Sequence, residues 1–358
     1  MARALVLGGT GVLGSAIARR LLSGGWAVDL VGRDPARLPD DLTAAGARFR
    51  MADRHNRAEL SGVYGDGTDL LVDCLCFTAE HARQLLPFAG DAASTVMISS
   101  KAVYVDEGGY HVNSAAAPRF PVPIRETDPT LAPGDGDYTT REGYGASKAA
   151  AEQVLLDSGA PVTVLRASKV HGAGARRPRE WYFVKRVLDR RPIALLAGHG
   201  AGVDHPTAAV NLAALVETVA GEPGCRILNS ADPDAPTGRE IAAIIAERLG
   251  HRWKEILLDE DASPGLGRHP WDARPPIVLD TAAAADLGYR AVGDYAATVA
   301  DTIDRLASSA VAGSDGAWHL PVSDRDFLAD SFDYPTEDSY LAGHPPREDT
   351  GVAVRSRR

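Results

Sequence analysis

The chain has 358 residues, which is enough for one large domain or two closely packed ones. Apolar residues make up 45% of it and the formal net charge is −10, so a full core is expected and a generic nucleic-acid binder, which needs a basic face, is disfavoured. No apolar stretch is long enough to cross a membrane, and the first residues lead into an apolar strand without a signal-peptide pattern. Three cysteines without metal-ligand spacing are typical of a reduced protein, so we expect a cytoplasmic chain without a metal.

The first half of the chain alternates short apolar runs with helical patterns. Strands are expected at residues 4–7, 27–31, 70–76, 95–99 and 162–166, and helices at 13–22 and 144–157. The alternation predicts parallel βαβ units, and the nearly continuous apolar character of the runs predicts strands that are covered on both faces. The fold class that follows is α/β, with a Rossmann-type doubly wound parallel sheet.

The pattern changes twice further along. Residues 105–138 are rich in Gly, Pro, Asn and Asp and predict a long loop of the kind that forms lids or binding loops. Beyond residue 172, helices are expected at 180–190, 209–220, 241–249, 280–287 and 295–306, with Thr237 and Glu240 forming a capping box. We therefore predict an NAD(P)-binding domain over 1–172, a smaller, mostly helical substrate lobe over 173–307 that interleaves with it, and a tail over 308–358 that either docks or is disordered.

A glycine-rich loop follows the first expected strand. It reads Gly8-Gly9-Thr10-Gly11-Val12-Leu13-Gly14, which is the spacing of a dinucleotide-binding fingerprint between a strand and a helix. Glycine permits the tight turn and the close approach of the backbone to a pyrophosphate, and the helix N-terminus offers free N–H groups to the phosphates. The residues expected to contact a dinucleotide are Gly8, Thr10, Gly11, Val12, Leu13 and Gly14.

The end of the second expected strand indicates which dinucleotide binds. Gly32 occupies the position where NAD enzymes usually carry an acid for the ribose 2′-hydroxyl, and Arg33 follows it. An arginine can pair bidentately with a 2′-phosphate, which favours NADP(H) over NAD(H), although a solvated Arg33 beside a turn capped by Asp34 would give the same pattern. Asp53 is a candidate for contacting the adenine amino group, and Arg54 for adding positive charge to the phosphate edge.

Tyr144 and Lys148 lie four residues apart on an expected helix and so share a face. A neighbouring ammonium favours the phenolate form of a tyrosine and lets it act as an acid or base nearer to neutral pH. Such a pair often arises by accident, as a surface lysine beside a half-buried tyrosine. Here, however, Ser99-Ser100 ends an apolar strand, where a hydroxyl could hold a substrate oxygen beside Tyr144. Together with the glycine loop, this set indicates hydride chemistry on a carbonyl or an alcohol.

These motifs resemble the extended short-chain dehydrogenases/reductases, also called the NAD-dependent epimerase/dehydratase family. The matching stretches are GGTGVLG, MISSKAVYVD, YGASKAAAE, LRASKVHGAG, and ILNSADPDAPTGREIA followed by LDTAAAADLGY, and they span roughly residues 3–306. The resemblance implies that Tyr144 is the acid/base, that Lys148 is its electrostatic partner and a ribose ligand, and that Ser100 rather than Ser99 orients the carbonyl. It also implies a homodimer with residues 149–156 at a helical interface.

The chain also departs from the family pattern. Lys169 stands where sugar-nucleotide members often carry Asn, and Asp204 stands about where they carry an Arg for the substrate diphosphate, which argues against a nucleotide-sugar substrate. A cluster of basic residues would suit an anionic small-molecule substrate, although a solvated helix face would show the same pattern. The cluster consists of Arg176, Arg177, Arg179, Lys185 and Arg186. Further candidates for the substrate pocket, each histidine having an ordinary turn or surface role as its alternative, are His171, His199, His205 and Trp181.

Three functions are compatible with this sequence. The leading expectation is an NADP-dependent oxidoreductase that acts on a small polar metabolite. The second is a sugar or sugar-nucleotide epimerase that keeps its cofactor bound; a dehydratase is less favoured, because Lys101-Ala102 stands where such enzymes place an acid pair. The third is a non-catalytic relative that binds a dinucleotide or RNA, and both the Ser100/Tyr144/Lys148 set and the negative net charge argue against it.

Overall fold

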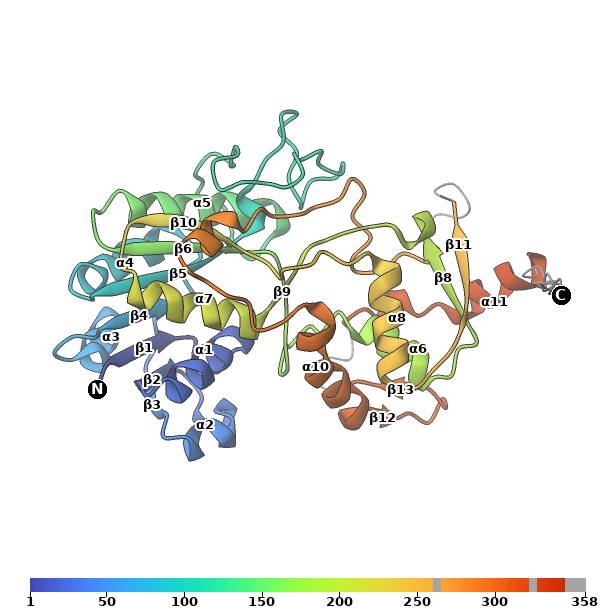
Figure 1. Ribbon diagram of the computed structural model, residues 1–358, viewed down its shortest axis with the longest axis horizontal. Helices are drawn as coiled ribbons and strands as arrows, with labels where there is room; N and C mark the ends of the chain where they lie inside the picture. Colours follow the sequence, from blue (N-terminus) through green and yellow to red (C-terminus); the bar gives the residue numbers. More distant parts are fainter. Residues whose placement is uncertain (260–264, 322–326, 345–358) are drawn as a thin grey trace, which may run out of the picture.

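The computed structural model describes residues 1–259, 265–321 and 327–344. Seven parallel strands form a central sheet in the order β10-β6-β5-β4-β1-β2-β3 (Figure 1). They are β1 (Arg3–Leu7), β2 (Ala27–Gly32), β3 (Arg48–Met51), β4 (Leu70–Asp73), β5 (Ser94–Ser100), β6 (Val162–Ala167) and β10 (Arg226–Ser230). The strand order reverses between β1 and β4, as in doubly wound dinucleotide-binding sheets, and the predicted fold class is confirmed.

Helices cover both faces of this sheet, because successive strand residues point to opposite sides. Ala4 and Val6 pack with one helical layer, and Leu5 and Leu7 pack with the other. The first layer contains α1 (Val12–Ser23), α2 (Asp40–Ala44), α7 (Ala209–Gly221) and α9 (Ala282–Asp286), and the second contains α3 (Arg57–Tyr64), α4 (Ala79–Ala89) and α5 (Arg141–Leu156). Within the described ranges, no helix is long and apolar enough to cross a membrane.

A second lobe stands beside the sheet, on the right of Figure 1. Its core is formed by α6 (Trp181–Leu188), α8 (Gly238–Arg248) and α10 (Tyr295–Ser309), and its two-stranded sheet by β8 (Ile193–Ala197) and β11 (Lys254–Leu258). The short strands β7 (Lys169–His171) and β9 (Pro206–Ala208) pair between the two parts. The predicted capping box is present at the start of α8. The chain returns to the main sheet at α7, β10 and α9, so residues beyond 172 contribute to both parts.

Some elements differ from the sequence prediction. The strand expected over 70–76 ends at Asp73, because the Asp73 carboxylate accepts a hydrogen bond from the Leu75 N–H at 2.7 Å and turns the chain out of the sheet. The helix expected over 280–287 is shorter, at Ala282–Asp286. The prediction misses α4, which contains Pro87, a residue that normally argues against a helix interior.

The long loop packs on α5. Phe120 and Ile124 share a core cluster with Ala149, and the Gly134 N–H donates to the Ala146 carbonyl at 3.0 Å. Figure 1 shows this segment lying over α5. Residues 149–152 and 155 of α5 are buried within one chain, with Ala149 packed on the loop and Ala151 and Leu155 packed on the sheet side. A homodimer through residues 149–156 stays a prediction; in this range Gln153 is exposed and Val154 and Leu156 are half-buried.

The tail also contacts the body, through α11 (Tyr334–Gly343) and the residues before it. Arg186 on α6 pairs with Glu337 at 2.6 Å, and the Tyr334 hydroxyl donates to Asp189 at 2.7 Å. Lys185 pairs with the same Asp189 at 2.7 Å. Lys185 also donates to the Trp318 carbonyl in β13 (Trp318–His319), a short strand that pairs with β12 (Val311–Ala312), and Arg186 donates to the Ser331 carbonyl. Both cations therefore bind the C-terminal segment, and the expectation that they belong to a basic cluster at the cleft is wrong.

Candidate active site

The glycine loop between β1 and α1 has the shape of a phosphate-binding turn. Gly8 has a φ of +82°, a conformation that disfavours any side chain, and its N–H donates to the Val31 carbonyl at 3.1 Å. A Cβ added to Gly14 would lie inside the contact distance of the Gly8 carbonyl oxygen and 2.7 Å from the Gly9 Cα. Gly14 therefore allows the first turn of α1 to pack directly on the loop backbone, which is the role of the third glycine in the dinucleotide-binding fingerprint. The loop leads directly into the N-terminus of α1, whose first N–H groups have no acceptors within the helix.

The end of β2 carries no acid at the ribose position. Gly32 lies beneath the Thr10 side chain and the Phe49 ring, which a Cβ on Gly32 would meet at 3.8 and 3.2 Å. Asp29, the acid within β2, is fully buried and pairs with Arg3 at 2.9 Å. Asp34 caps the following turn by accepting from the Ala36 N–H at 3.0 Å.

The Arg33 side chain is exposed at this edge, and within the described part of the chain it forms no ion pair. Asp53, in the loop just after β3, is half-buried, and one of its carboxylate oxygens accepts from the His55 N–H at 2.9 Å. Arg54 lies elsewhere: it is 3% exposed, its guanidinium donates to the Asp73 carboxylate at 3.1 Å, and it also donates to the His81 carbonyl. A contact between Arg54 and the cofactor would require this buried pair to break, so the structure gives Arg54 a role in packing.

Helix α5 carries Tyr144 and Lys148 to the C-terminal ends of β4 and β5. The Thr140 hydroxyl caps the helix by accepting from the Gly143 N–H at 3.1 Å. Gly145 then allows α5 to approach the turn after β5, because a Cβ at this position would collide with the Ala102 carbonyl oxygen. This close approach places Tyr144 and Ser100 on the wall of one cavity.

The two serines at the end of β5 have different surroundings. The Ser99 hydroxyl is buried and donates to Glu152 at 2.5 Å, and Glu152 is in turn paired with Arg166 at 2.7 Å. The Ser100 hydroxyl is half-buried, accepts from the Ala102 N–H at 3.2 Å and keeps its proton free for another acceptor. These contacts favour Ser100 as the residue that orients a substrate oxygen.

Lys148 is 2% exposed beneath the cavity. Its ammonium donates to the carbonyls of Cys76 at 2.6 Å and Ile98 at 2.8 Å, and it lies 4.3 Å from the centre of the Phe77 ring. Phe77 also stacks on Tyr138 with ring centres 5.2 Å apart, and both rings line the cavity. Neither aromatic residue was predicted from the sequence; the only available signal was the position of Phe77 at the end of an apolar run.

The cavity beside Ser100 and Tyr144 has a volume of about 550 Å³. Part of its wall is cationic and includes Lys101, Lys169, Arg177 and Arg179. Asp204 contacts both lysines, with Lys169 at 2.6 Å. Burial and the charge of Arg179 lower the pKa of Lys169 to about 7. Of the basic group predicted for the cleft, Arg177 and Arg179 are found there.

The other candidates for the substrate pocket have partners outside this cavity. His171 bonds to Asp232 at 2.8 Å, and His205 bonds to the Asp232 carbonyl at 2.8 Å. His199 is exposed and pairs with Asp259 at 2.6 Å. Trp181 is buried in the core of the second lobe. Among the residues that the structure describes, no three His, Cys, Asp or Glu side chains are grouped so that they could hold a metal ion.

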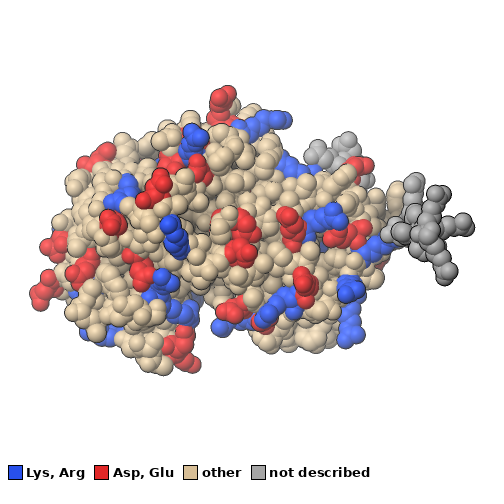
Figure 2. Space-filling model, in the orientation of Figure 1, with Lys and Arg blue, Asp and Glu red and all other residues tan. Residues whose placement is uncertain are grey.

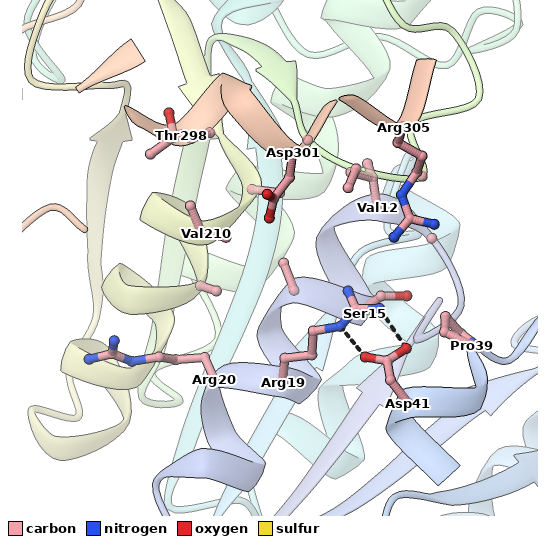
Figure 3. A pocket seen from close by; sticks show the side chains of 18 of the residues that line it. Val12, Ser15, Arg19, Arg20, Pro39, Asp41, Val210, Thr298, Asp301 and Arg305 are labelled. Carbon is pink, nitrogen blue, oxygen red and sulfur yellow. Dashed lines mark hydrogen bonds and ion pairs between the residues drawn. The ribbon is translucent and has the colours of Figure 1, made fainter. Parts of the chain in front are cut away.

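A larger cavity, of about 970 Å³, lies on the outer side of α1, between the two lobes (Figure 3). Arg19 of α1 pairs there with Asp41 at 2.6 Å, and Asp301 and Arg305 project into it from α10. The cavity shares Thr10, Gly11 and Val12 with the glycine loop but contains none of Ser100, Tyr144 and Lys148. The chemistry of the predicted set therefore belongs to the smaller cavity.

The sequence model of the NAD dependent epimerase/dehydratase family matches residues 4–208, which is more than half of the chain. The chain belongs to this family. The predicted family is thereby confirmed, and so is the assignment to an enzyme family that uses a nicotinamide dinucleotide. A search of curated protein sequences found no match.

Solved structures show the same fold over most of the chain. UDP-glucose 4-epimerase of Thermus thermophilus in complex with NAD is 19% identical, with a TM-score of 0.60 over 85% of this chain and 98% of that one. The dTDP-glucose 4,6-dehydratase of Bacillus anthracis in complex with NAD is 16% identical, with a TM-score of 0.65 over 86% and 97%. UDP-glucose-4-epimerase of Stenotrophomonas maltophila, with bound NAD and formylated UDP-arabinopyranose, is 20% identical, with a TM-score of 0.66 over 85% and 98%.

Proposed function

We propose that this protein is an NADP-dependent oxidoreductase that reduces a carbonyl, or oxidises an alcohol, on a small polar metabolite. The observation that carries the proposal is the meeting of Ser100 and Tyr144 on one cavity wall, above the buried Lys148. When bound, the nicotinamide would exchange a hydride with the substrate carbon. The cofactor residues proposed are those of the glycine loop, namely Gly8, Thr10, Gly11, Val12, Leu13 and Gly14, with Arg33 and Asp53 at the adenosine end.

In this proposal each protein residue has one task. Ser100 donates its free hydroxyl proton to the substrate oxygen and orients it. Tyr144 gives a proton to that oxygen during reduction, or takes it during oxidation. The Lys148 ammonium stabilises the phenolate through its charge, and the Cys76 and Ile98 carbonyls fix its position.

The preference for NADP rests on the end of β2. A 2′-phosphate carries negative charge, so an acid at that position would repel it, whereas Arg33 can bind it. Gly32 leaves no acid there, and the two acids nearby in the sequence, Asp29 and Asp34, are occupied by Arg3 and by the turn N–H.

The experiment that tests the proposal is a carbonyl substrate screen that follows NADPH consumption, with Tyr144→Phe beside the wild type. Loss of the phenol should reduce turnover at least about 100-fold while NADPH binding is kept. Tyr138→Phe is the matched control, because it removes a second phenol from the same cavity but keeps the ring stacked on Phe77. Full activity in Tyr144→Phe, or an equal loss in Tyr138→Phe, would refute the assigned role.

A second candidate, an epimerase that retains its cofactor, is favoured by the 4-epimerases among the structural neighbours. The same Ser100/Tyr144/Lys148 set would serve an internal hydride cycle. The two functions differ in how cofactor is handled: an epimerase should purify with a bound dinucleotide and show no net nicotinamide turnover, whereas an oxidoreductase should exchange it freely.

A nucleic-acid partner receives no support from the surface seen in Figure 2. Basic and acidic side chains are interspersed over this face, and no continuous basic patch is visible on it. Salt-sensitive nucleic-acid affinity depends on several clustered cations that neutralise phosphates together. The proposal names a small-molecule substrate because Ser100 and Tyr144 line a cavity of about 550 Å³.

A further inference from the structure

The cationic wall next to Ser100 is built from residues that the proposed hydride chemistry does not use. Lys101 directly follows Ser100, and adjacent Cα atoms are about 3.8 Å apart. Lys169, the first residue of β7, and Arg179, just before α6, line the same cavity. Three separate segments of the chain therefore place cations around one space beside the reacting centre.

Lys101 is buried, Lys169 and Arg179 are half-buried, and the charges of the three are only partly compensated. Lys101 is 7% exposed, and Arg179 donates from its Nη1 to the Val170 carbonyl at 3.3 Å. Within the described ranges, Asp204 is the one carboxylate that contacts the lysines, and it is shared between the two. Glu180 is the next acid, and it is buried beside the Tyr295 hydroxyl, whose pKa is raised by burial and by the charge of Glu180.

The shortage of negative charge around Lys101, Lys169 and Arg179 is reflected in their pKa values. Burial, followed by the charges of Lys169 and Arg179, holds the pKa of Lys101 well below its ordinary value, and burial also lowers the pKa of Arg179. Buried charges are normally paired, because an unpaired charge in a low-dielectric interior is costly. An anion in the cavity would supply the missing negative charge.

We propose that Lys101, Lys169 and Arg179 bind a carboxylate or phosphate group that the substrate carries close to its reacting carbon. This inference rests on the proposed function, because the reacting carbon is the one held at Ser100 and Tyr144. It narrows the substrate class to a hydroxy or keto compound with a nearby oxyanion, such as a sugar acid or a phosphorylated polyol. The anion is near the reaction, since Lys101 is the neighbour of Ser100.

The position of Asp204 agrees with this assignment. A residue that bound a remote diphosphate from this position would have to be cationic, but Asp204 is negative and is turned to Lys101 and Lys169. It holds the two lysine side chains in place at the cavity, where an arriving oxyanion would favour their charged forms. The charge that recognises the substrate is thus beside the reacting carbon.

The test uses calorimetric titration of the full-length protein with oxalate and, separately, with inorganic phosphate, at constant ionic strength and with and without NADPH. The wild type should bind at least one of the two saturably, at one per chain. Lys101→Met and Lys169→Met should weaken that binding about 10-fold or more, which is the loss expected for one charge-assisted hydrogen bond. Arg125→Met, which removes an exposed cation outside the cavity, should leave it unchanged.

Arg179→Met guards against misfolding, because Arg179 is only half-buried and pairs with a backbone carbonyl, so its loss leaves no buried carboxylate without a partner. It too should weaken oxyanion binding. Tighter binding of oxalate would indicate a carboxylate substrate, and tighter binding of phosphate a phosphorylated one. No saturable binding of either, or equal binding in all variants, would overturn the inference.

NADPH binding, measured on the same samples, separates the two proposals. Protein that binds the oxyanion but neither dinucleotide would refute the proposed function and leave the anion site standing. Protein that binds NADPH but neither oxyanion would refute the anion site alone.

Discussion

Replacement of Gly145 by alanine should separate Tyr144 from Ser100. The added Cβ would lie about 1 Å inside the ordinary van der Waals separation from the Ala102 carbonyl oxygen, and 2.7 Å from Leu131 Cδ1. A backbone carbonyl cannot turn aside as the end of a flexible side chain can, so either α5 or the turn at 101–103 has to move. Overpacking of this kind costs about 1–3 kcal/mol, and a displacement of about 1 Å at a reacting centre costs on the order of 100-fold in rate.

Gly62→Ala is the matched control, because Gly62 lies within α3 and an added Cβ there meets nothing within 4 Å. It should stabilise the protein by about 0.5–1 kcal/mol, through the higher helix propensity of alanine. Urea unfolding would measure both changes in stability, and NADPH consumption with a substrate from the carbonyl screen would measure turnover. Gly145→Ala should bind NADPH normally, since the glycine loop is untouched. Wild-type turnover and stability in Gly145→Ala would refute the reasoning.

Three other substitutions test the cofactor edge and the buried pair behind it. Arg33→Ala should weaken NADPH binding about 10-fold or more and leave NADH binding unchanged. Arg290→Ala, which removes another exposed arginine, should change neither affinity. If titrations show that Arg33→Ala keeps the wild-type preference for NADPH, the cofactor assignment is contradicted. Arg54→Ala should lower the free energy of unfolding by about 3–5 kcal/mol, because it leaves Asp73 buried without its cation, and a loss below about 1 kcal/mol in urea would show that the pair is not needed. The pKa of His81 is lowered to about 4 by burial and by the charge of Arg54, so between pH 6.5 and 4 the unfolded chain binds a proton that the folded chain does not. The free energy of unfolding should therefore decrease as the pH is lowered from 6.5 to 4. In His81→Gln this decrease, measured from urea midpoints, should be smaller.

Much of the fold was predictable because it depends on local patterns. The glycine loop, the apolar runs of β1, β2, β5 and β6, and the capping box of α8 each carry their signal within a few residues. The elements that were missed depend on contacts from outside their own sequence. Helix α4 tolerates Pro87 because the rest of the helix packs on the sheet, and β4 ends at Asp73 because of a side-chain hydrogen bond.

The candidate site was predictable in its motif residues and not in its surroundings. Tyr144 and Lys148 are four residues apart, so one helix brings them together. Lys101, Lys169 and Asp204 come from three different segments, and their meeting depends on how β7 and the second lobe pack against β5. Lys185 and Arg186 follow Arg179 closely in the sequence, but they lie within helix α6, where Lys185 pairs with Asp189 and Arg186 pairs with Glu337 of the tail.

Native mass spectrometry of the purified full-length protein, with NADPH or NADH added, tests the central claim most directly. We expect one dinucleotide per chain, reversible exchange, and NADPH displacing NADH when both are present. A chain that binds neither dinucleotide would contradict the claim that the glycine loop and the cavity at Ser100 and Tyr144 form the active site of a nicotinamide-dependent enzyme.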